Sequence, residues 1–372
     1  MKLLTLKPEM HKFNSVKEFC QEFKVGKGDL IITNEFIYKP SFEELNLESN
    51  VIFQEKYEPG EPSDDMVEAM YNDIKDIEYK RVIGVGGGSV LDASKLFALK
   101  DISPVLDLFD KKVDAVKAKE LILVPTTCGT GSEVTNIAIL ALISRNTKMG
   151  LATNELYADY AVMVPKLLES LPFKPFAHSA IDALIHATES VLSPRATAYT
   201  NIFAYEAIRM IIDGFRRIAE DGEDYRKQEL LEKLLYASNY AGIAFGNSGV
   251  GLVHAMSYPI GGKYHVPHGE SNYLLFTEIF KNYTKANPDG QIKVLNQALA
   301  EILGCDISQV YDKLEELLDK LIQRKKLREY GMTESDLDDF VENVVTKQTR
   351  LTQNSYVQFS PEEIRKIYEV LF

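Results

Sequence analysis

The hydrophobic pattern divides the chain into two parts, and it changes between Pro165 and Pro175. Before the change, short apolar runs alternate with segments of helical periodicity at residues 63–77 and 90–99. The apolar runs are residues 30–33, 51–53, 82–85, 121–124 and 161–164. Strands that alternate with helices indicate a parallel sheet with crossover helices. We therefore predict an α/β domain over residues 1–170.

The second part of the chain is helical in pattern almost throughout. Its apolar-periodic segments are residues 198–218, 227–244, 291–303, 308–325 and 361–371. Capping signals support this pattern: Thr333 and Asp336 precede one periodic segment, and Ser360-Pro361 opens the last one. We predict an all-α domain over residues 171–372.

A glycine turn follows the apolar strand in the segment RVIGVGGGSVLDASKLFAL. Such a turn lets the backbone approach a diphosphate, and the N–H groups of the following helix start hold negative charge. Its residues are Gly86, Gly87, Gly88 and Ser89. The spacing Gly84-x-Gly86-x-x-Ser89 approximates the dinucleotide fingerprint, but Asp107, near the expected distance for a ribose-binding acid, follows no recognisable strand. We predict a phosphate cradle, with an ordinary tight turn as the alternative.

A second loop, PTTCGTGSEVTN, also follows an apolar strand. Its hydroxyl side chains are those of Thr126, Thr127, Thr130, Ser132 and Thr135. They can surround phosphate and ribose with neutral donors, and Lys148 can add a positive charge. Both loops are expected at the carboxyl edge of one sheet, where ligands bind in open α/β folds. This favours a dinucleotide site over a flexible polar loop.

The second part carries a candidate metal site. Asp182 and His186 are four residues apart in IDALIHATES, so a helix places both on one face. His254 and His268 follow, and five of the six histidines fall in this half. Three histidines and one carboxylate leave a position for substrate oxygen or water, as in catalytic sites. The alternative is a pair on a solvated helix.

Charge and composition exclude several classes of protein. The chain has 42 basic and 55 acidic residues, a net charge of −13, and lacks the basic face that nucleic acid requires. Three cysteines without paired spacing indicate a reducing compartment. We find neither a secretory signal nor a stretch near the about 18 apolar residues that span a bilayer. We expect a cytoplasmic enzyme with a small-molecule substrate, no nucleic-acid partner and no membrane contact.

Metal ligands on one domain and phosphate loops on the other predict an active site in the cleft between them. In hydride transfer, a divalent cation polarises the aldehyde carbonyl and stabilises the alkoxide. Nitrogen and oxygen ligands suit Fe²⁺ and Zn²⁺ alike.

The motifs GGGSVLDASK, PTTCGTGSEVTN, DALIHATE, GLVHAM and PHGE occur in one order along the chain. In these motifs the sequence resembles the iron-dependent (group III) alcohol dehydrogenases. The segments GEPSDDM, SNYAGIAFGNSGVGLVHAMSYPIGG and LREYGM are similar to those of the NAD-dependent 4-hydroxybutyrate dehydrogenases. The resemblance implies reversible reduction of succinate semialdehyde to 4-hydroxybutyrate, with Fe²⁺ and NAD as cofactors.

The resemblance also implies roles for individual residues. Asp182, His186, His254 and His268 take the iron-ligand positions. The positions near the nucleotide are Gly87, Gly88, Ser89, Asp92, Thr126, Thr127, Thr130, Ser132, Asn136 and Lys148.

Three departures from the family pattern affect these roles. Asn34 stands where many relatives have an Asp that binds the adenosine ribose, so NAD is the first choice and NADP stays open. Tyr258 replaces a histidine discussed as a proton carrier, which leaves His265 as the candidate catalytic proton carrier or as a residue without a role. Glu61 replaces an Asn near the nicotinamide.

The sequence offers four candidates for binding a substrate carboxylate: Arg195, Tyr258, Lys263 and Tyr264. Alternative activities are oxidation of another primary alcohol or diol, and a metal-dependent lyase or cyclase reaction of the dehydroquinate synthase type. The resemblance implies a homodimer or larger homo-oligomer.

Overall fold

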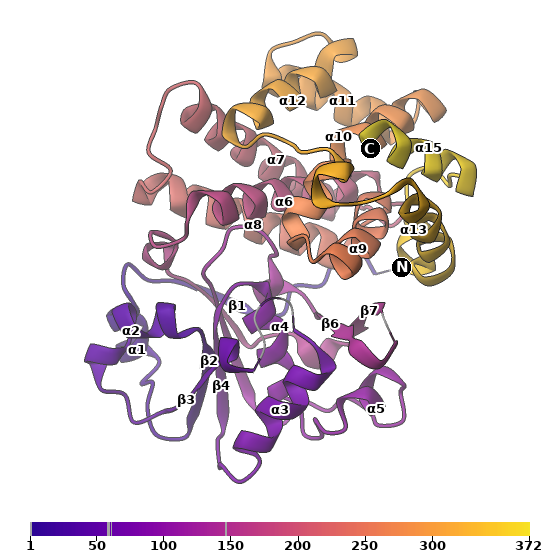
Figure 1. The fold of residues 1–372 in the computed structure, drawn as a ribbon. Helices are drawn as coiled ribbons and strands as arrows, with labels where there is room; N and C mark the ends of the chain where they lie inside the picture. Colours follow the sequence, from indigo (N-terminus) through magenta and orange to yellow (C-terminus); the bar gives the residue numbers. More distant parts are fainter. Residues whose placement is uncertain (1, 58–59, 61, 146) are drawn as a thin grey trace. The chain divides into compact units, whose positions relative to one another are not determined.

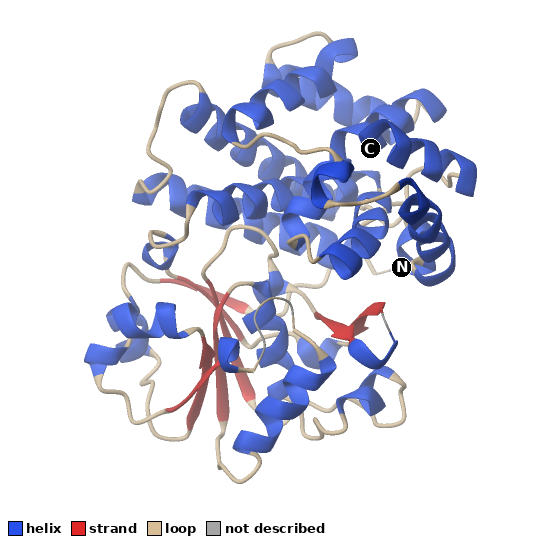
Figure 2. Ribbon diagram, viewed as in Figure 1, coloured by secondary structure: helices blue, strands red, loops and turns tan. Residues whose placement is uncertain are grey.

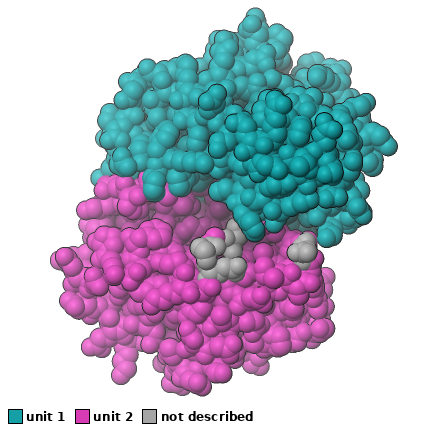
Figure 3. Space-filling model, viewed as in Figure 1, with its two compact units in different colours: residues 1–5, 172–372 teal, residues 6–171 magenta. Residues whose placement is uncertain are grey.

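The computed structural model describes residues 2–57, 60, 62–145 and 147–372, so Glu61 lies outside the described residues (Figure 1). The chain divides into two compact units (Figure 3). One unit comprises Leu6–Leu171, and the other Pro172–Phe372 together with residues 2–5. We call them the α/β unit and the helical unit and describe each by itself.

The α/β unit is built on a six-stranded parallel sheet in the order β1-β8-β5-β4-β2-β3. Its strands are β1 Glu9–Lys12, β2 Asp29–Thr33, β3 Asn50–Phe53, β4 Arg81–Gly86, β5 Glu120–Pro125 and β8 Tyr160–Met163. The five strands predicted from apolar runs are confirmed. Strand β1 was missed because it is an edge strand with three exposed residues out of four, and so has no buried apolar run.

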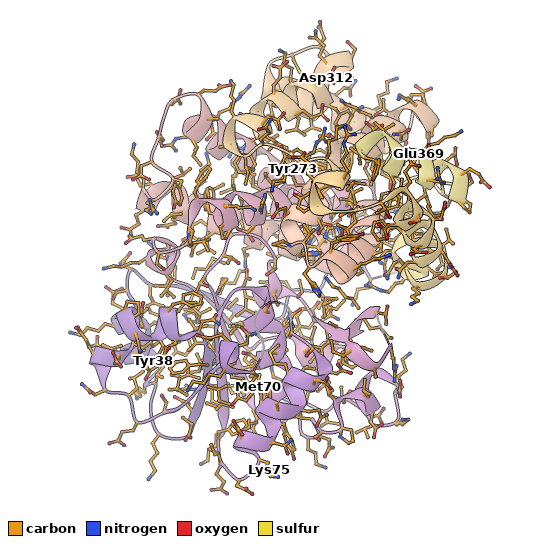
Figure 4. All side chains as sticks on the ribbon, viewed as in Figure 1. Tyr38, Met70, Lys75, Tyr273, Asp312 and Glu369 are labelled. Atoms are coloured by element: carbon orange, nitrogen blue, oxygen red, sulfur yellow. The ribbon has the colours of Figure 1, made fainter. Side chains whose placement is uncertain are left out.

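Both faces of the sheet are buried at its inner strands, which explains why β2, β4 and β5 carry continuous apolar runs. Alternate residues of one strand enter different cores: Leu30 and Ile32 pack with α3, α4 and α5, whereas Ile31 packs with α1 and α2. These helices are α1 Val16–Glu22, α2 Glu35–Ser41, α3 Asp64–Ile74, α4 Gly88–Phe97 and α5 Val105–Phe109. Met70 of α3 is fully buried in the first of these cores (Figure 4).

The strand order reverses between β2 and β4. The chain runs from β2 outward to β3, then returns past β2 to β4 and continues to β5 and β8 on the other side. In open α/β sheets the crevice at such a switch point binds ligands at the carboxyl ends of the strands. A separate antiparallel hairpin, β6 Ile137–Leu142 with β7 Thr147–Ala152, was not predicted.

In the helical unit, the described residues form helices and loops but no strand, as predicted (Figure 2). The helices are α6 Phe173–Leu192, α7 Ala198–Ala219, α8 Gln228–Ser248, α9 Leu252–Tyr264, α10 His268–Ala286, α11 Gln291–Leu303, α12 Val310–Leu321, α13 Glu334–Lys347, α14 Thr349–Thr352 and α15 Pro361–Leu371. At the predicted cap of α15, Ser360 Oγ accepts from the amide of Glu363. Across the described part of the chain, no helix combines the length and apolar character needed to cross a membrane.

Helix α12 ends before the predicted boundary at residue 325, because Ile322 leaves the helix in an extended conformation. Tyr273 of α10 stabilises this ending, since its hydroxyl lies 3.0 Å from Asp319 Oδ1 and 3.2 Å from the carbonyl oxygen of Ile322 (Figure 4).

Candidate functional site

Helix α6 is buried around its whole circumference from Ala180 to Leu192. Buried polar side chains need partners, so the polar residues of this stretch are informative. Asp182, His186 and Glu189 follow one another at intervals of four and three residues, which places them along one face of the helix. That face is the base of the candidate metal site.

Two other helices bring histidines to this face. His254 lies in the first turn of α9, and His268 is the first residue of α10. The ligand atoms of Asp182, His186, His254 and His268 all lie within 4.8 Å of one another. Nε2 of His268 lies 3.8 Å from Asp182 Oδ2, and Nε2 of His254 lies 3.8 Å from Oδ1. The structure thus brings together the four residues singled out in the sequence.

The group is enclosed except at His268. The His268 side chain is 30% exposed, whereas those of Asp182, His186 and His254 are at most 5% exposed. The ring of Phe245 stacks on His186, with centroids 4.1 Å apart. Another molecule can therefore approach the group from the side of His268.

Glu189 fixes the orientation of His254. Its Oε2 lies 2.7 Å from Nδ1 of His254 and also accepts from the amide of Gly251, while Oε1 accepts from the amide of Val253. Since a carboxylate in these contacts only accepts hydrogen bonds, the proton of His254 belongs on Nδ1. The lone pair of Nε2 then faces the four-residue group.

Asn272, one turn after His268 on α10, lies against the same group. Its Nδ2 is 2.7 Å from Asp182 Oδ1, 3.1 Å from His254 Nε2 and 3.2 Å from His268 Nε2. One amide has two N–H hydrogens for these three acceptors, and within the described residues its buried Oδ1 has no hydrogen-bond partner. An excess of acceptors around one point is the pattern expected where a cation belongs.

The charge of Asp182 agrees with this interpretation. Burial raises the pKa of its carboxyl, but the imidazoles of His186, His268 and His254 and the bond from Asn272 bring the pKa below its ordinary value. A carboxylate and three imidazole nitrogens form a donor set that Fe²⁺ and Zn²⁺ both accept. The residues present therefore fit a divalent cation.

The other candidates of the helical unit lie in different surroundings. Tyr258 is 9% exposed, and its ring centroid lies 6.0 Å from that of His268. His265 is an exposed residue with a φ of 52° that ends α9, and it does not belong to the four-residue group. Lys263 pairs with Asp336 and Asp339, and Tyr264 donates to Asp336.

Arg195 follows α6 and is exposed at the surface. Its Nε donates to Oδ1 of Asn354 over 2.9 Å. Tyr258 is thus the carboxylate-binding candidate whose ring lies beside a residue of the four-residue group.

The glycine turn of the α/β unit joins β4 to α4, with Gly87 as N-cap and Gly88 as first helical residue. A Cβ atom on Gly88 would lie 2.7 Å from Cγ2 of Thr130, and one on Gly86 would lie 2.6 Å from the side chain of Val90. The two predicted nucleotide loops are therefore in close contact, and glycine is required for that approach. Backbone N–H groups at this helix start fit a diphosphate.

Lys95 of α4 contacts the second loop and is fully buried. Its Nζ contacts the side chains of Asp92, Ser132 and Thr135 at 3.2, 2.6 and 3.0 Å, and the carbonyl oxygen of Ile137 at 2.6 Å. Burial lowers the pKa of Lys95, against the opposing effect of Asp92. Asp92 and Ser132, predicted beside the nucleotide, are thus bonded to each other and to this lysine.

The remaining predicted nucleotide residues lie on several elements of the α/β unit. Thr126 and Thr127 directly follow β5, and the amide of Thr126 donates to the carbonyl oxygen of Gly86. Asn136 immediately precedes β6, and Lys148 lies on β7. Asn34 is buried at the end of β2, and Ser89 lies in the first turn of α4. Asp107 belongs to α5 and pairs with Lys112.

Four residues that the structure places at these sites were not predicted from the sequence. They are Glu55, Lys95, Glu189 and Asn272. Helical spacing could have identified three of them: Lys95 is three residues after Asp92, Glu189 three after His186, and Asn272 four after His268. Glu55 has no comparable signal, because its neighbour Asn34 comes from another strand.

Each of the two units matches a protein-family model of iron-containing alcohol dehydrogenases. Residues 9–165 match the family "Iron-containing alcohol dehydrogenase", and residues 176–372 match "Fe-containing alcohol dehydrogenase family, C-terminal".

Similar proteins support the same grouping. The chain is 55% identical to a 4-hydroxybutyrate dehydrogenase of Clostridium kluyveri over 372 residues, the whole of both chains. It is 29% identical to a sulfoacetaldehyde reductase of Bilophila wadsworthia, covering 99% of this chain and 98% of that one. Among solved structures, sulfoacetaldehyde reductase from Bifidobacterium kashiwanohense in complex with NAD⁺ matches with a TM-score of 0.86 at 22% identity, covering 100% of this chain and 99% of the other. Together, the family matches and the full-length relative show that this chain belongs to the iron-containing alcohol dehydrogenase family.

Proposed function

We propose that the protein is a metal-dependent, NAD-linked dehydrogenase that interconverts succinate semialdehyde and 4-hydroxybutyrate. The main support for this substrate is the 55% identity with a 4-hydroxybutyrate dehydrogenase over the whole of both chains. The carboxylate and three imidazoles that converge on one point support the metal.

We assign the metal ligands as Asp182, His186, His254 and His268, with Fe²⁺ as the cation and Zn²⁺ as the alternative. When bound, the cation would polarise the aldehyde carbonyl, and the reduced nicotinamide would supply the hydride. Glu189 orients His254, and Asn272 holds Oδ1 of Asp182. The exposed side of His268 is where substrate would enter.

We assign the nucleotide to the carboxyl edge of the sheet in the α/β unit. The N–H groups at the start of α4 would hold the diphosphate, with hydroxyl donors from the second loop beside it. The cofactor-binding residues in this proposal are Asn34, Gly86, Gly87, Gly88, Ser89, Asp92, Thr126, Thr127, Thr130, Ser132, Asn136 and Lys148. An NAD⁺ complex of a structural neighbour supports NAD as the first choice.

Two further residues are assigned to the chemistry of the substrate. The hydroxyl of Tyr258 would donate a hydrogen bond to the substrate carboxylate, since the buried ring of Tyr258 lies beside His268. His265 would exchange the alcohol proton with solvent, because it is exposed and three residues from His268. A His265→Ala enzyme with an unchanged pH profile of kcat would exclude this second role.

The test of the function is an aldehyde panel. The protein is reconstituted anaerobically with Fe²⁺ and assayed with NADH and NADPH on succinate semialdehyde, butanal, propanal and a hydroxyaldehyde. We expect the highest kcat/KM for succinate semialdehyde, with one NADH oxidised per aldehyde reduced. A higher kcat/KM for an uncharged aldehyde would overturn the assignment of succinate semialdehyde as the substrate. Nucleotide binding without net oxidation of NADH would favour the lyase or cyclase alternative.

The proposal also includes a cytoplasmic homodimer or larger homo-oligomer. Sedimentation of the purified protein tests the assembly, and a monomer at micromolar concentration would contradict it.

A further inference from the structure

Asn34 lies beside the glycine turn at the switch point of the sheet. Ile32 of β2 is in register with Gly84 of β4, and the Thr33 hydroxyl donates to the carbonyl oxygen of Val85 over 2.8 Å. Asn34 is the next residue, so it leaves the sheet at the level of the turn. In nucleotide-binding α/β folds, an acidic residue at the end of the neighbouring strand binds the adenosine ribose. An amide alone lacks the charge of such an acid.

A carboxylate from the adjoining strand stands next to this amide. Glu55 follows β3, which pairs with β2 on the side away from β4. Its Oε2 accepts from Nδ2 of Asn34 over 2.9 Å, and its Oε1 accepts from the backbone amide of Glu35 over 2.6 Å. Glu55 therefore caps the start of α2. Asn34 is the N-cap residue of this helix, but its own side chain forms no capping hydrogen bond.

The contacts of Glu55 leave it able to bind a further donor. A carboxylate can accept about four hydrogen bonds, and two N–H groups occupy Glu55. Among the described residues, Glu55 forms no ion pair with a lysine or arginine. The neighbouring cations are engaged elsewhere: Lys39 pairs with Glu35, and Nζ of Lys56 lies 4.9 Å from the ring centroid of Phe53.

We propose that Glu55 is the residue that selects NAD over NADP, supplying from β3 the carboxylate that position 34 lacks. A ribose 2′-hydroxyl can donate to this carboxylate, whereas a 2′-phosphate would bring a second negative charge against it. The inference rests on the proposed nucleotide site and deepens it. It requires nothing of the metal site, which belongs to the other unit.

The test measures binding of NADH and NADPH, which differ only in the 2′-phosphate, to the full-length metal-free protein by calorimetry. We expect the wild type to bind NADPH at least about tenfold more weakly than NADH, because like charges placed together are costly. In Glu55→Gln, which keeps the size of the side chain, we expect this ratio to fall by about tenfold or more, chiefly through tighter NADPH binding.

The matched control is Glu44→Gln. It removes the same charge from an exposed position beyond the other end of α2, and it should leave the ratio unchanged. Equal affinities of the wild type for the two nucleotides would overturn the inference, and this arm needs no variant. A Glu55→Gln ratio equal to that of Glu44→Gln would also overturn it, leaving Glu55 as a helix cap. Failure of the wild type to bind either nucleotide would overturn the nucleotide site itself.

Discussion

Glu189 and His254 are joined by a 2.7 Å contact between a carboxylate oxygen and Nδ1 of the imidazole. The same carboxylate accepts from the backbone amides of Gly251 and Val253 at the start of α9, so it positions both the ring and the backbone that carries it. Since all three partners are N–H groups, the contact directs the unprotonated nitrogen of His254 toward Asp182, His186 and His268. The candidate metal site thus depends on a residue that is not itself a ligand.

Replacing Glu189 by Gln should weaken metal binding by about 10- to 100-fold, the usual effect of removing the partner of a ligating histidine. In one orientation the glutamine NH₂ group faces a backbone N–H, so two donors meet. In the other orientation it donates to Nδ1 of His254, and the proton of the imidazole then moves to Nε2. The measurement is competition for Zn²⁺ or Co²⁺ with a chromogenic chelator.

Thr188→Val is the matched control for this variant. Thr188 is equally buried on α6, but its hydroxyl returns to the helix backbone at Leu184 and Ile185. Equal metal affinities of the two variants would show that Glu189 has no such role. An Nε2-protonated His254 in ¹⁵N spectra of the metal-free wild type would contradict it independently of any variant.

Lys95→Met should destabilise the α/β unit and weaken NADH binding together. Methionine fills the same space but leaves Asp92 and its neighbours without the buried ammonium, and breaking such a pair costs about 3 kcal/mol. Urea unfolding and NADH titration measure the two effects. Metal affinity should not change, because the ligands lie on the other unit. If the exposed control Lys100→Met behaves identically, Lys95 does not organise the loops.

The stability of the helical unit should fall in mild acid because of His178. Burial is the main cause that lowers its pKa below the ordinary value, with Lys174 and Lys325 adding to it and Glu270 opposing it. The unfolded chain takes up a proton below about pH 6.5, while the native chain does so only at lower pH, so stability decreases as the pH falls through this range.

His178→Asn should reduce the stability difference between pH 7.5 and pH 5 by on the order of 1 kcal/mol. Urea midpoints of the metal-free proteins at both pH values give the comparison. An unchanged difference would mean that His178 titrates alike in the native and unfolded chains.

Tyr258→Phe separates substrate binding from catalysis. If the hydroxyl binds the substrate carboxylate, KM for succinate semialdehyde should rise about tenfold, the effect of one lost hydrogen bond to a charged group, while KM for butanal stays nearly constant. Steady-state kinetics on both aldehydes decides this. Equal losses on the two would assign Tyr258 a structural role.

Much of this architecture follows from local signals in the sequence. Apolar runs such as residues 82–85 identify buried parallel strands, because strands covered on both faces need no alternation. The metal ligands could be predicted because Asp182 and His186 share a helix face and histidine is rare in this chain.

What could not be predicted depends on contacts between distant elements. The exposed edge strand β1 forms by pairing with β8, which lies about 150 positions later in the chain. Glu55 reaches Asn34 from the neighbouring strand, 21 positions later in the chain. No spacing rule within one element describes such contacts.

The most direct test of the account is a titration of metal-free protein with Fe²⁺ under anaerobic conditions, with NADH-dependent reduction of succinate semialdehyde as the signal. We predict that activity rises in proportion to bound iron and saturates at one Fe²⁺ per chain. The His268→Ala variant should bind NADH normally but should neither bind Fe²⁺ nor reduce succinate semialdehyde. Full turnover by the wild type without any metal would contradict the central claim.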